Sequence, residues 1–239
     1  MDLADRMDLA DRTVVVTGAS RGIGRAVALQ TARAGARVVA GARDEADLES
    51  LEAEHDRIRT HRLDVRDPAS VDAFCEFALE QGPVDALVNN AGIGVFAPVD
   101  ELTIEAWDRV FEVNVRGTFL TTRALLPSLR AQRGQVINVT SDVSARTFAN
   151  GSLYTASKHA QRAFTRALQM ELAGDGVRVT EVRPGVVATH FGDGTPRPAD
   201  ASALAAEDVA DTIVYALTRP ERMRLDEIHF HPQGQTPEY

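Results

Sequence analysis

The stretch TVVVTGASRGIG, residues 13 to 24, joins a short valine-rich run to a turn with glycines at positions 18, 22 and 24. The apolar run predicts a buried strand, and a helix is expected to begin near Ile23. Glycine permits the tight turn and a close backbone approach to an anion, while a helix N-terminus offers unpaired N–H groups. An ordinary glycine-rich turn is the simpler interpretation, but a further strand, helix and strand follow in order. The stretch therefore predicts a dinucleotide-binding α/β fold.

Valine-rich runs alternate with segments of helical period along the rest of the chain. The runs predict seven strands, at 13–17, 37–42, 60–64, 86–90, 135–140, 178–183 and 227–231. Helices are predicted near 22–34, 45–54, 68–80, 103–113, 116–131, 154–173 and 207–217. Such alternation is typical of parallel sheets, because each crossover places its helix on a face of the sheet. We therefore expect an α/β fold with a doubly wound (Rossmann) seven-stranded parallel sheet and helices on both faces.

Composition limits the class of partner. The chain has 239 residues, enough for one sizeable α/β domain, and 35 acidic against 26 basic residues give a formal charge of −9. This charge argues against a nucleic-acid partner and against an anionic membrane surface. Cys75 is the single cysteine, and no apolar run approaches the ~20 residues of a membrane helix. We expect a cytoplasmic protein that binds a small molecule, with no nucleic-acid, membrane or metal partner.

The N-terminus repeats the sequence MDLADR twice in tandem, which is too short for a structural repeat. We expect residues 1–12 to form an N-terminal extension and residues 13–239 to form a single Rossmann-fold domain that binds the dinucleotide and carries the catalytic groups. Met1 to Arg6 are interpreted as surplus, so their deletion is expected to leave activity intact. The segment FGDGTPRPAD at 191–200 has the glycine and proline density of a mobile loop.

The sequence YTASKHA at 154–160 sets a tyrosine and a lysine four positions apart. On a helix, Tyr154 and Lys158 then lie on one face, about one turn apart. At ~4 Å and an effective dielectric near ~20, the ammonium would favour the phenolate by about 4 kcal/mol and bring the tyrosine pKa close to neutrality. The alternative is an ordinary surface pair on an amphipathic helix.

The end of the second predicted strand, VVAGAR at 38–43, indicates which dinucleotide is bound. An acidic residue there would bind the ribose 2′-OH of NAD, whereas an arginine would pair with the 2′-phosphate of NADP. This chain has Ala42 followed by Arg43, and Arg21 in the glycine turn adds a second cation. We therefore expect NADP(H) to be favoured over NAD(H). The alternative is that Arg43 is a solvated residue at a helix start, with Asp44 weakening its field.

Six motifs in order give the chain a family resemblance. They are TGASRGIG (17–24), LDV (63–65), NNAG (89–92), Asn114 in FEVNVRG, Ser141 in NVTS, and YTASK (154–158). Together they resemble the short-chain dehydrogenase/reductase family over nearly the whole chain from Met7. The resemblance implies that Tyr154 is the general acid/base, that Lys158 lowers its pKa and holds the nicotinamide ribose, that Ser141 binds the reacting oxygen, and that Asn114 positions a water.

The resemblance also implies a set of cofactor contacts. Besides Tyr154 and Lys158, these are Gly18, Ser20, Arg21, Gly22, Ile23, Gly24, Arg43, Asp64, Val65, Asn90, Ala91, Gly92, Pro184, Gly185, Val187 and Thr189. Family members often have glycine three residues after the catalytic serine, whereas this chain has Ser144 there. Several of the proposed site residues also have a simpler structural explanation, such as a tight turn at NNAG or a backbone hydrogen bond at Ser141.

Three loops are expected to form the substrate pocket, because they follow strand carboxyl ends: the turn after Gly92, the segment 142–153, and the loop from His190 to Ala203. Phe96, Phe148 and Phe191 would supply an apolar wall, and Arg146, Asn150 and His190 would meet a polar or anionic group; ordinary loop packing is the alternative for each. The C-terminal stretch resembles family members that oxidise 3-hydroxy acids or serine and reduce small carbonyls. Apolar positions on the helices near 116–131 and 154–173 indicate a homotetramer or at least a homodimer, or else packing on the subunit's own sheet.

We therefore predict an NADP(H)-dependent oxidoreductase that moves hydride between nicotinamide and a small carbonyl or secondary alcohol. One alternative is a non-catalytic NADP(H) sensor, against which the retained catalytic-type residues argue. Another is a sugar-nucleotide epimerase or dehydratase, which usually needs an additional substrate lobe that so few residues after the last strand would not supply.

Overall fold

A seven-stranded parallel sheet forms the centre of the protein in a computed structural model that describes residues 9–191 and 198–236. Its strands are β1 (Thr13–Thr17), β2 (Arg37–Ala42), β3 (Ile58–Arg62), β4 (Ala86–Asn89), β5 (Gln135–Val139), β6 (Arg178–Pro184) and β7 (Glu227–Phe230). They lie in the order β3-β2-β1-β4-β5-β6-β7, so the expected doubly wound sheet is confirmed. The strand order reverses between β1 and β4, and this reversal opens a crevice at the carboxyl ends of those strands.

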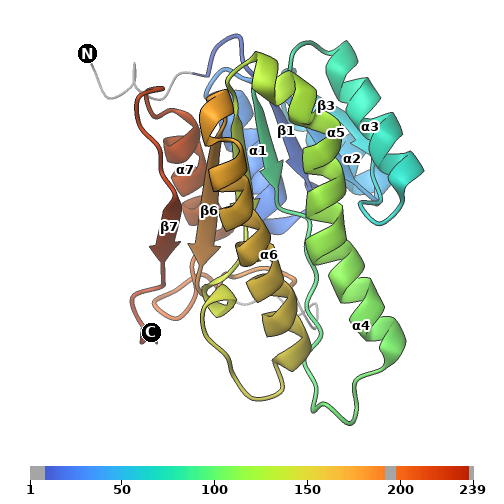
Figure 1. Cartoon of the computed structure of the whole chain (residues 1–239), viewed down its shortest axis with the longest axis vertical. Helices are drawn as coiled ribbons and strands as arrows, with labels where there is room; N and C mark the ends of the chain where they lie inside the picture. The colour runs from blue at the N-terminus through green and yellow to red at the C-terminus, as the bar shows by residue number, and fades with distance from the viewer. Residues whose placement is uncertain (1–8, 192–197, 237–239) are drawn as a thin grey trace.

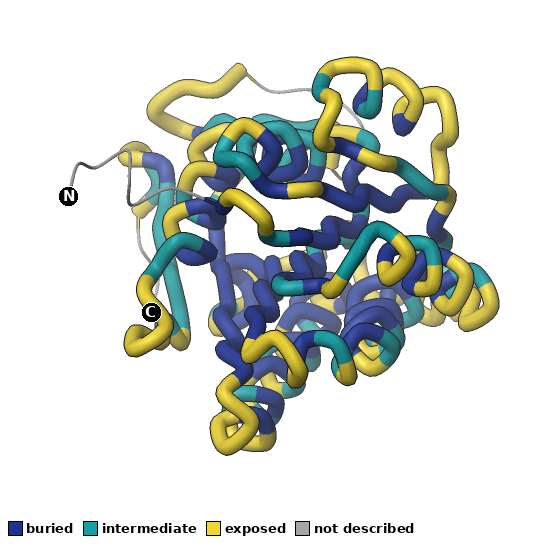
Figure 2. Tube along the Cα trace, turned by 90° about the horizontal axis from the view of Figure 1, so that it is seen from above, coloured by how far each residue is buried: buried dark blue, intermediate teal, exposed yellow. Residues whose placement is uncertain are grey.

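Helices cover both faces of the sheet (Figure 1). They are α1 (Gly22–Arg33), α2 (Glu45–Glu54), α3 (Pro68–Glu80), α4 (Ile104–Phe111), α5 (Thr118–Ala131), α6 (Ser152–Glu171) and α7 (Ala206–Leu217). The core beneath α1, α2 and α7 contains Val14 and Val16, whereas the core beneath α3, α5 and α6 contains Val15. Side chains of β1 therefore alternate between the two faces, and both faces are buried. Figure 2 shows this burial concentrated in the sheet and on the helix sides that face it.

Short-range signals set several helix ends where the sequence places them. The side chain of Asp67 accepts a hydrogen bond from the Ala69 N–H, and Pro68 occupies the first turn of α3. After α1, Gly35 adopts a positive φ of 99°, and its N–H donates to the Ala32 carbonyl. Such caps satisfy backbone groups that the helix itself leaves unpaired, so they appear directly in the sequence.

The two helices predicted near 103–113 and 116–131 are joined, which corrects the sequence-based boundary between them. A π-helical turn, η2 (Glu112–Gly117), links α4 to α5 without a break. Gly117 keeps helical angles there, and a Cβ at this position would lie 2.7 Å from Val65 Cγ2. The glycine therefore serves close packing against Val65 and does not end a helix. The wider turn buries Asn114 completely.

Strand β3 lies two residues earlier than predicted, at 58–62 and not 60–64. Its register is set by β2, since Ile58 pairs with Val38 and Arg62 with Ala42, the last residue of β2. Asp64 is thus outside the strand, and its N–H donates to Ser70 Oγ at 3.0 Å. The end of β3 is therefore set by the end of β2, and local composition carries no information about that pairing.

Residues 9–12 pack on the domain, although residues 1–12 were expected to form an extension. Leu9 is buried in the core beneath α1 and α7, its N–H donates to the Ala34 carbonyl at 2.8 Å, and the Arg12 carbonyl accepts from the Arg37 N–H at 2.9 Å. Met1 to Arg6, and most of the predicted loop at 191–200, lie outside the described residues. Within the described ranges no helix is both long and apolar enough to cross a membrane.

Candidate active site

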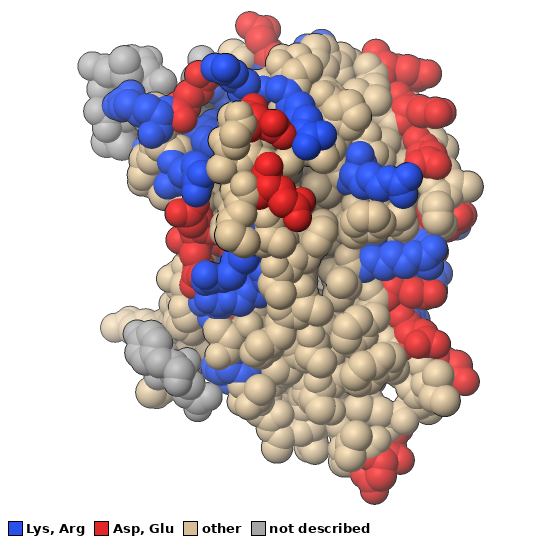
Figure 3. All heavy atoms as spheres, viewed as in Figure 1, with Lys and Arg blue, Asp and Glu red and all other residues tan. Residues whose placement is uncertain are grey.

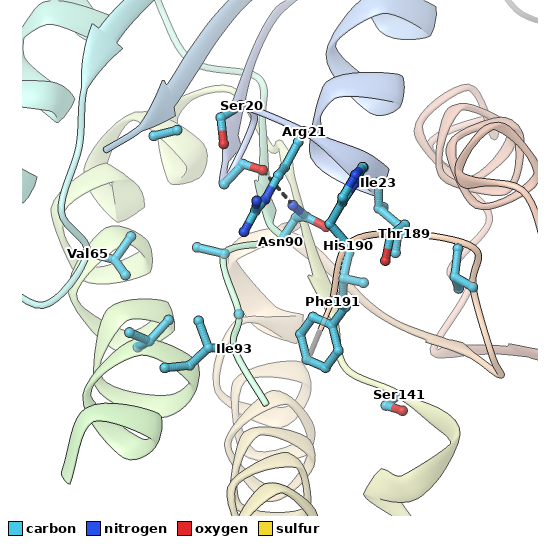
Figure 4. Close-up of a pocket in the computed structure, with 18 of the residues that line it drawn as sticks. Ser20, Arg21, Ile23, Val65, Asn90, Ile93, Ser141, Thr189, His190 and Phe191 are labelled. Atoms are coloured by element: carbon cyan, nitrogen blue, oxygen red, sulfur yellow. Dashed lines mark hydrogen bonds between the residues drawn. The ribbon is translucent and has the colours of Figure 1, made fainter. Parts of the chain in front are cut away.

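The glycine turn between β1 and α1 is held by Asn90, which follows β4. The Asn90 side-chain amide donates to the carbonyl oxygens of Thr17 and Gly18 at 3.1 and 3.2 Å. Figure 4 shows this amide pointing toward the turn. Gly18 and Gly22 have positive φ angles of 68° and 56°, and a Cβ on Gly24 would lie 2.5 Å from Asn90 Nδ2 and closer still to the Gly18 oxygen. The predicted glycines are therefore required by the shape of the turn.

The N-terminus of α1 fits the pyrophosphate of a dinucleotide. No side chain caps it, and its first turn carries no acidic residue, so its N–H groups face the crevice between β1 and β4 without a competing anion. Gly22 keeps the backbone bare at this point, and the nearest group that a Cβ would meet is the Thr189 methyl at 3.2 Å. The residues present thus form a cradle for a phosphate-bearing ligand.

Two arginines lie at the end of the crevice nearest β2. Within residues 9–191 and 198–236, the Arg21 and Arg43 guanidinium groups form no side-chain hydrogen bond or ion pair, and both line the cleft. Asp64, on the neighbouring loop, is neutralised by Arg66, whose Nη2 lies 2.6 Å from its carboxylate. The hydrogen bond from Arg66 is the largest influence on Asp64 and lowers the pKa of its carboxyl. The net charge available to a ligand here is therefore positive.

Most of the predicted site residues line one continuous cleft. The cleft is lined by Gly18, Ser20, Arg21, Gly22, Ile23, Arg43, Asp64, Val65, Asn90, Ala91, Gly92, Ser141, Tyr154, Lys158, Pro184, Gly185, Val187 and Thr189. Sequence reasoning did not name Ile93, Val113 and Thr140, which also line it. Gly24 and Asn114 lie behind the lining. The described residues contain no group of histidine, cysteine and carboxylate side chains that would hold a metal ion.

Ser141, Tyr154 and Lys158 meet at the carboxyl end of β5. Ser141 follows that strand, whereas Tyr154 and Lys158 lie in the first two turns of α6, with exposed fractions of 8%, 8% and 3% respectively. Ser141 Oγ donates to Asp142 Oδ1 at 3.0 Å, and Ser141 and Tyr154 line the same cleft. The three polar groups are therefore held in a nearly dry environment beside the phosphate cradle, where electrostatic interactions are strong.

The expected fall in the pKa of Tyr154 is wrong for this structure. Burial of the phenol has the largest effect and raises its pKa, the neighbouring Ser141 side chain lowers it, and the charge of Asp142 raises it. Lys158 Nζ lies 5.9 Å from the centroid of the Tyr154 ring. Tyr154 is therefore protonated at neutral pH, as a proton donor must be.

Lys158 is held by groups that the sequence did not single out. Its Nζ donates to the Val139 carbonyl at 3.1 Å and to Gln161 Oε1 at 2.8 Å. Gln161 in turn donates to Thr118 Oγ1 at 3.0 Å, which ties α6 to α5. Burial lowers the pKa of Lys158 to about 7, although Glu181 acts in the opposite direction. The ammonium charge is thus only partly present at neutral pH, which weakens its effect on the tyrosine.

Asn114 fastens the segment that follows β4. Its side-chain amide donates to the Ile93 carbonyl and to Ser157 Oγ, both at 2.9 Å, and its Oδ1 accepts from the Ile93 N–H at 2.9 Å. These bonds connect three elements, because Ile93 follows β4, Asn114 lies in η2 and Ser157 lies in α6. The contacts make Asn114 a positioning residue for the floor of the cleft.

Asp142 is a functional candidate that sequence reasoning missed. Ser141 Oγ donates to its Oδ1 at 3.0 Å, while Arg146 Nη2 and Gln235 Nε2 donate to its Oδ2 at 2.6 and 2.7 Å. Burial alone would raise the pKa of this carboxyl, but these hydrogen bonds lower it overall, so Asp142 is ionised. The acidic residue beside Ser141 was visible in the sequence, but its contact with Gln235, 93 positions away, was not.

Ser144, the departure from the family pattern, has a specific partner. Its hydroxyl donates to Glu181 Oε1 at 3.0 Å, and Thr140 Oγ1 donates to the same oxygen at 2.7 Å. Both hydroxyls are buried, and Glu181 is only 1% exposed. The serine therefore anchors the turn after Ser141 to β6, where a glycine would leave a buried carboxylate with one donor fewer.

Comparisons with known proteins agree with this geometry. A family model described as short chain dehydrogenase matches residues 12–198. Glycine betaine reductase ATRR of Emericella nidulans is 38% identical over 242 residues, which cover 95% of this chain but 19% of that much longer protein. An oxidoreductase of Staphylococcus aureus (strain MRSA252), described as uncharacterized, is 33% identical over 94% of this chain and 98% of its own length. The alcohol dehydrogenase of the archaeon Thermococcus sibiricus, solved with 5-hydroxy-NADP, superimposes with a TM-score of 0.92 at 37% identity, covering 95% of this chain and 99% of that one.

Proposed function

The chain belongs to the short-chain dehydrogenase family and is an oxidoreductase, and from that premise we propose that it moves hydride between NADP(H) and a small carbonyl compound or its secondary alcohol. The sequence-based expectation also covered 3-oxo and 3-hydroxy acids, so the test panel below includes them. The observation that carries the proposal is the meeting of Ser141, Tyr154 and Lys158 in the same cleft as the phosphate cradle. Reduction is the proposed direction, and the cytoplasm, where NADPH is kept reduced, is the proposed location.

The proposed mechanism assigns one role to each polar group. The nicotinamide supplies or accepts the hydride when it is bound. In reduction, Tyr154 gives its phenolic proton to the carbonyl oxygen, so that the carbonyl gains one hydride and one proton and becomes an alcohol. Ser141 orients that oxygen through its hydroxyl. Lys158 places a partly protonated amine beside the cleft, and Asn114 keeps the Ile93 segment in place beneath the ligand.

The proposed reaction is tested by following NADPH consumption with a panel of aldehydes, ketones, diketones and 3-oxo acids. Tyr154→Phe is expected to lower turnover by at least ~100-fold, because the proton donor is lost, while NADPH binding persists. A variant as active as the wild type would refute the role of Tyr154. Stable NADPH binding by the wild type without turnover of any carbonyl would favour the sensor function instead.

Preference for NADP(H) is supported by the uncommitted guanidinium groups of Arg21 and Arg43, since hydrogen bonds to charged groups are worth about 1.5–3 kcal/mol. Arg43→Asp is expected to weaken NADPH binding by at least ~10-fold and to change NADH binding much less. Arg33→Asp, on the far end of α1, introduces the same charge change away from the cleft and serves as the control. Equal affinity of the wild type for NADPH and NADH would overturn the preference.

We also propose a homotetramer or homodimer that buries an apolar patch on α4 to α6. The patch consists of Phe111, Val115, Phe119 and Phe164, and Phe119 is 42% exposed. Asp108, Glu112 and Arg116 border the patch, and Figure 3 shows charged side chains along the α4–α5 side of this face. Phe119→Glu is expected to lower the sedimentation coefficient to that of a monomer, whereas Leu79→Glu, on α3 and equally exposed, is not. A wild-type monomer at micromolar concentration would refute the proposal.

A further inference from the structure

Three phenylalanine side chains from separate loops form one cluster beside the ring of Tyr154. Phe96 follows β4, Phe148 precedes α6, and Phe191 follows β6. The ring centroids of Phe96 and Phe191 each lie 5.4 Å from that of Tyr154, and Phe148 lies 5.9 Å from Phe96. All three loops follow the carboxyl side of the sheet, where ligands bind. We call Phe96, Phe148 and Phe191 the aromatic wall.

Two glycines make room for the aromatic wall. A Cβ on Gly94 would lie 2.7 Å from a ring atom of Phe191 and 2.8 Å from one of Phe96. A Cβ on Gly151 would lie 2.5 and 2.7 Å from two ring atoms of Phe148. The rings therefore lie directly against bare backbone, an arrangement that most other residues at these positions would prevent. The wall is fixed by its packing rather than formed by rings projecting loosely from the loops.

Much of each ring still remains available for contact. Phe96, Phe148 and Phe191 are 44%, 40% and 41% exposed, although Phe96 and Phe191 pack against the nearly buried Tyr154. Apolar surface of this kind beside a polar reacting group is what a substrate with an apolar substituent would cover. Figure 4 shows Phe191 and His190 on the segment that borders the cleft.

The nearby cations do not favour an acid substrate. Arg146, which lies between Ser141 and Tyr154 in the chain, donates to Asp142 through both Nε and Nη2, at 3.0 and 2.6 Å. Arg183 forms an ion pair with Glu227 and donates to the Asp142 carbonyl. These guanidinium groups are already paired with carboxylates, so a substrate carboxylate would have to displace a buried ion pair to bind them.

We propose that the substrate is an uncharged carbonyl compound with an aromatic substituent, whose ring packs on the aromatic wall while its carbonyl oxygen faces Tyr154 and Ser141. This inference rests on the proposed carbonyl reduction and narrows its substrate class. Offset or edge-on ring contacts add to the stabilisation from burying apolar area. An aryl group should therefore gain more binding free energy here than an alkyl group of similar length. Free 3-oxo acids are correspondingly poor substrates.

The test compares matched substrates by NADPH consumption. Diacetyl and its phenyl analogue, in which phenyl replaces one methyl group, present the same methyl ketone with and without a ring. Acetoacetate and its ethyl ester differ in the charge of the acid. We expect kcat/KM to be at least ~10-fold higher for the phenyl diketone than for diacetyl, and higher for the ester than for the acid. Equal values within either pair overturn the inference.

Variants separate binding of the ring from support of Tyr154. Phe96→Ala and Phe191→Ala are expected to lower kcat/KM for the phenyl diketone by about 10-fold and to change diacetyl reduction by less than about 3-fold. Phe96→Leu, which keeps apolar volume, should recover part of the loss. Tyr215→Ala removes an equally exposed aromatic side chain from α7 and is the control. A parallel loss with both diketones overturns the inference, because it means that the wall only supports Tyr154.

A calorimetric titration keeps this inference separable from the proposed function. With NADP⁺ present, the phenyl diketone is expected to bind the wild type at least ~10-fold more tightly than diacetyl. Preferential binding without turnover of any carbonyl would refute carbonyl reduction and leave the aromatic wall as a ligand site. Turnover of diacetyl and acetoacetate without any phenyl preference would refute the inference and leave carbonyl reduction standing.

Discussion

Replacing Gly24 by alanine places a methyl group inside the glycine turn. The added carbon would lie 2.5 Å from Asn90 Nδ2 and closer still to the Gly18 oxygen, whereas real Cβ contacts essentially never fall below 3.0 Å. The obstacles are a backbone carbonyl and an amide whose position is fixed by two hydrogen bonds. Either the start of α1 or the Asn90 side chain must therefore move.

The magnitude follows from the contacts that are lost. Displacing Asn90 breaks its bonds to the Thr17 and Gly18 carbonyls, at about 0.5–1.5 kcal/mol each. Overpacking a fixed site adds about 1–3 kcal/mol, so the free energy of unfolding should fall by about 2–6 kcal/mol. At about 2–4 °C per kcal/mol for a domain of this size, Tm should fall by roughly 4–24 °C. NADPH affinity should fall at least ~10-fold, because the displaced backbone forms the phosphate cradle.

Thermal denaturation followed by circular dichroism and a fluorescence titration with NADPH measure both effects. Gly174→Ala is the matched control, because a Cβ there meets nothing within 4 Å. Its free energy of unfolding should change by no more than about 0.5 kcal/mol, so its Tm should stay close to that of the wild type. Its NADPH affinity should be unchanged. If Gly24→Ala matched the wild type in Tm and in affinity, the turn would not be the rigid cradle described above.

Three further predictions concern buried ionisable groups. Because burial lowers the pKa of Lys158 from 10.5 to about 7, the unfolded state binds more protons between these values, and the unfolding free energy of the wild type should rise with pH across that window. Urea titrations at several pH values should show this rise in the wild type and not in Lys158→Met; parallel curves would contradict it. Asp142→Asn removes a charge that raises the pKa of Tyr154, so the alkaline limb of the pH–rate profile for carbonyl reduction should move to lower pH, and an unmoved limb would refute this coupling. Burial raises the pKa of Cys75 to about 12, so a thiol reagent should label it only as the chain unfolds, and rapid labelling of the native protein would show that the thiol is accessible.

The order of strands and helices was predictable because its signals are local. Buried parallel strands appear as short apolar runs, and Asp67 with Pro68 or Gly35 marks a helix end through its own backbone chemistry. The observed element boundaries differ from the predicted ones where packing against a neighbouring element sets the boundary. Strand β3 ends with its partner β2, and η2 continues a helix in which Gly117 packs against Val65.

The candidate site divides in the same way. The glycine turn, Arg43, Ser141, Tyr154 and Lys158 were identified from motifs, since their chemistry and spacing are visible along the chain. Gln161 beneath Lys158, the bond from Gln235 to Asp142, and the clamp that Asn90 places on the glycine turn were not, because each joins groups that only folding brings together.

By itself, the sequence determined the doubly wound fold and the glycine turn and identified the candidate reacting side chains, because these depend on residue type and short-range spacing. Tertiary structure decided the protonation state of Tyr154 and the apolar character of the surface beside it. The pKa of a phenol depends on how completely water is excluded from it and on charges such as Asp142, and three phenylalanines from three loops form one wall only when the sheet aligns its carboxyl ends.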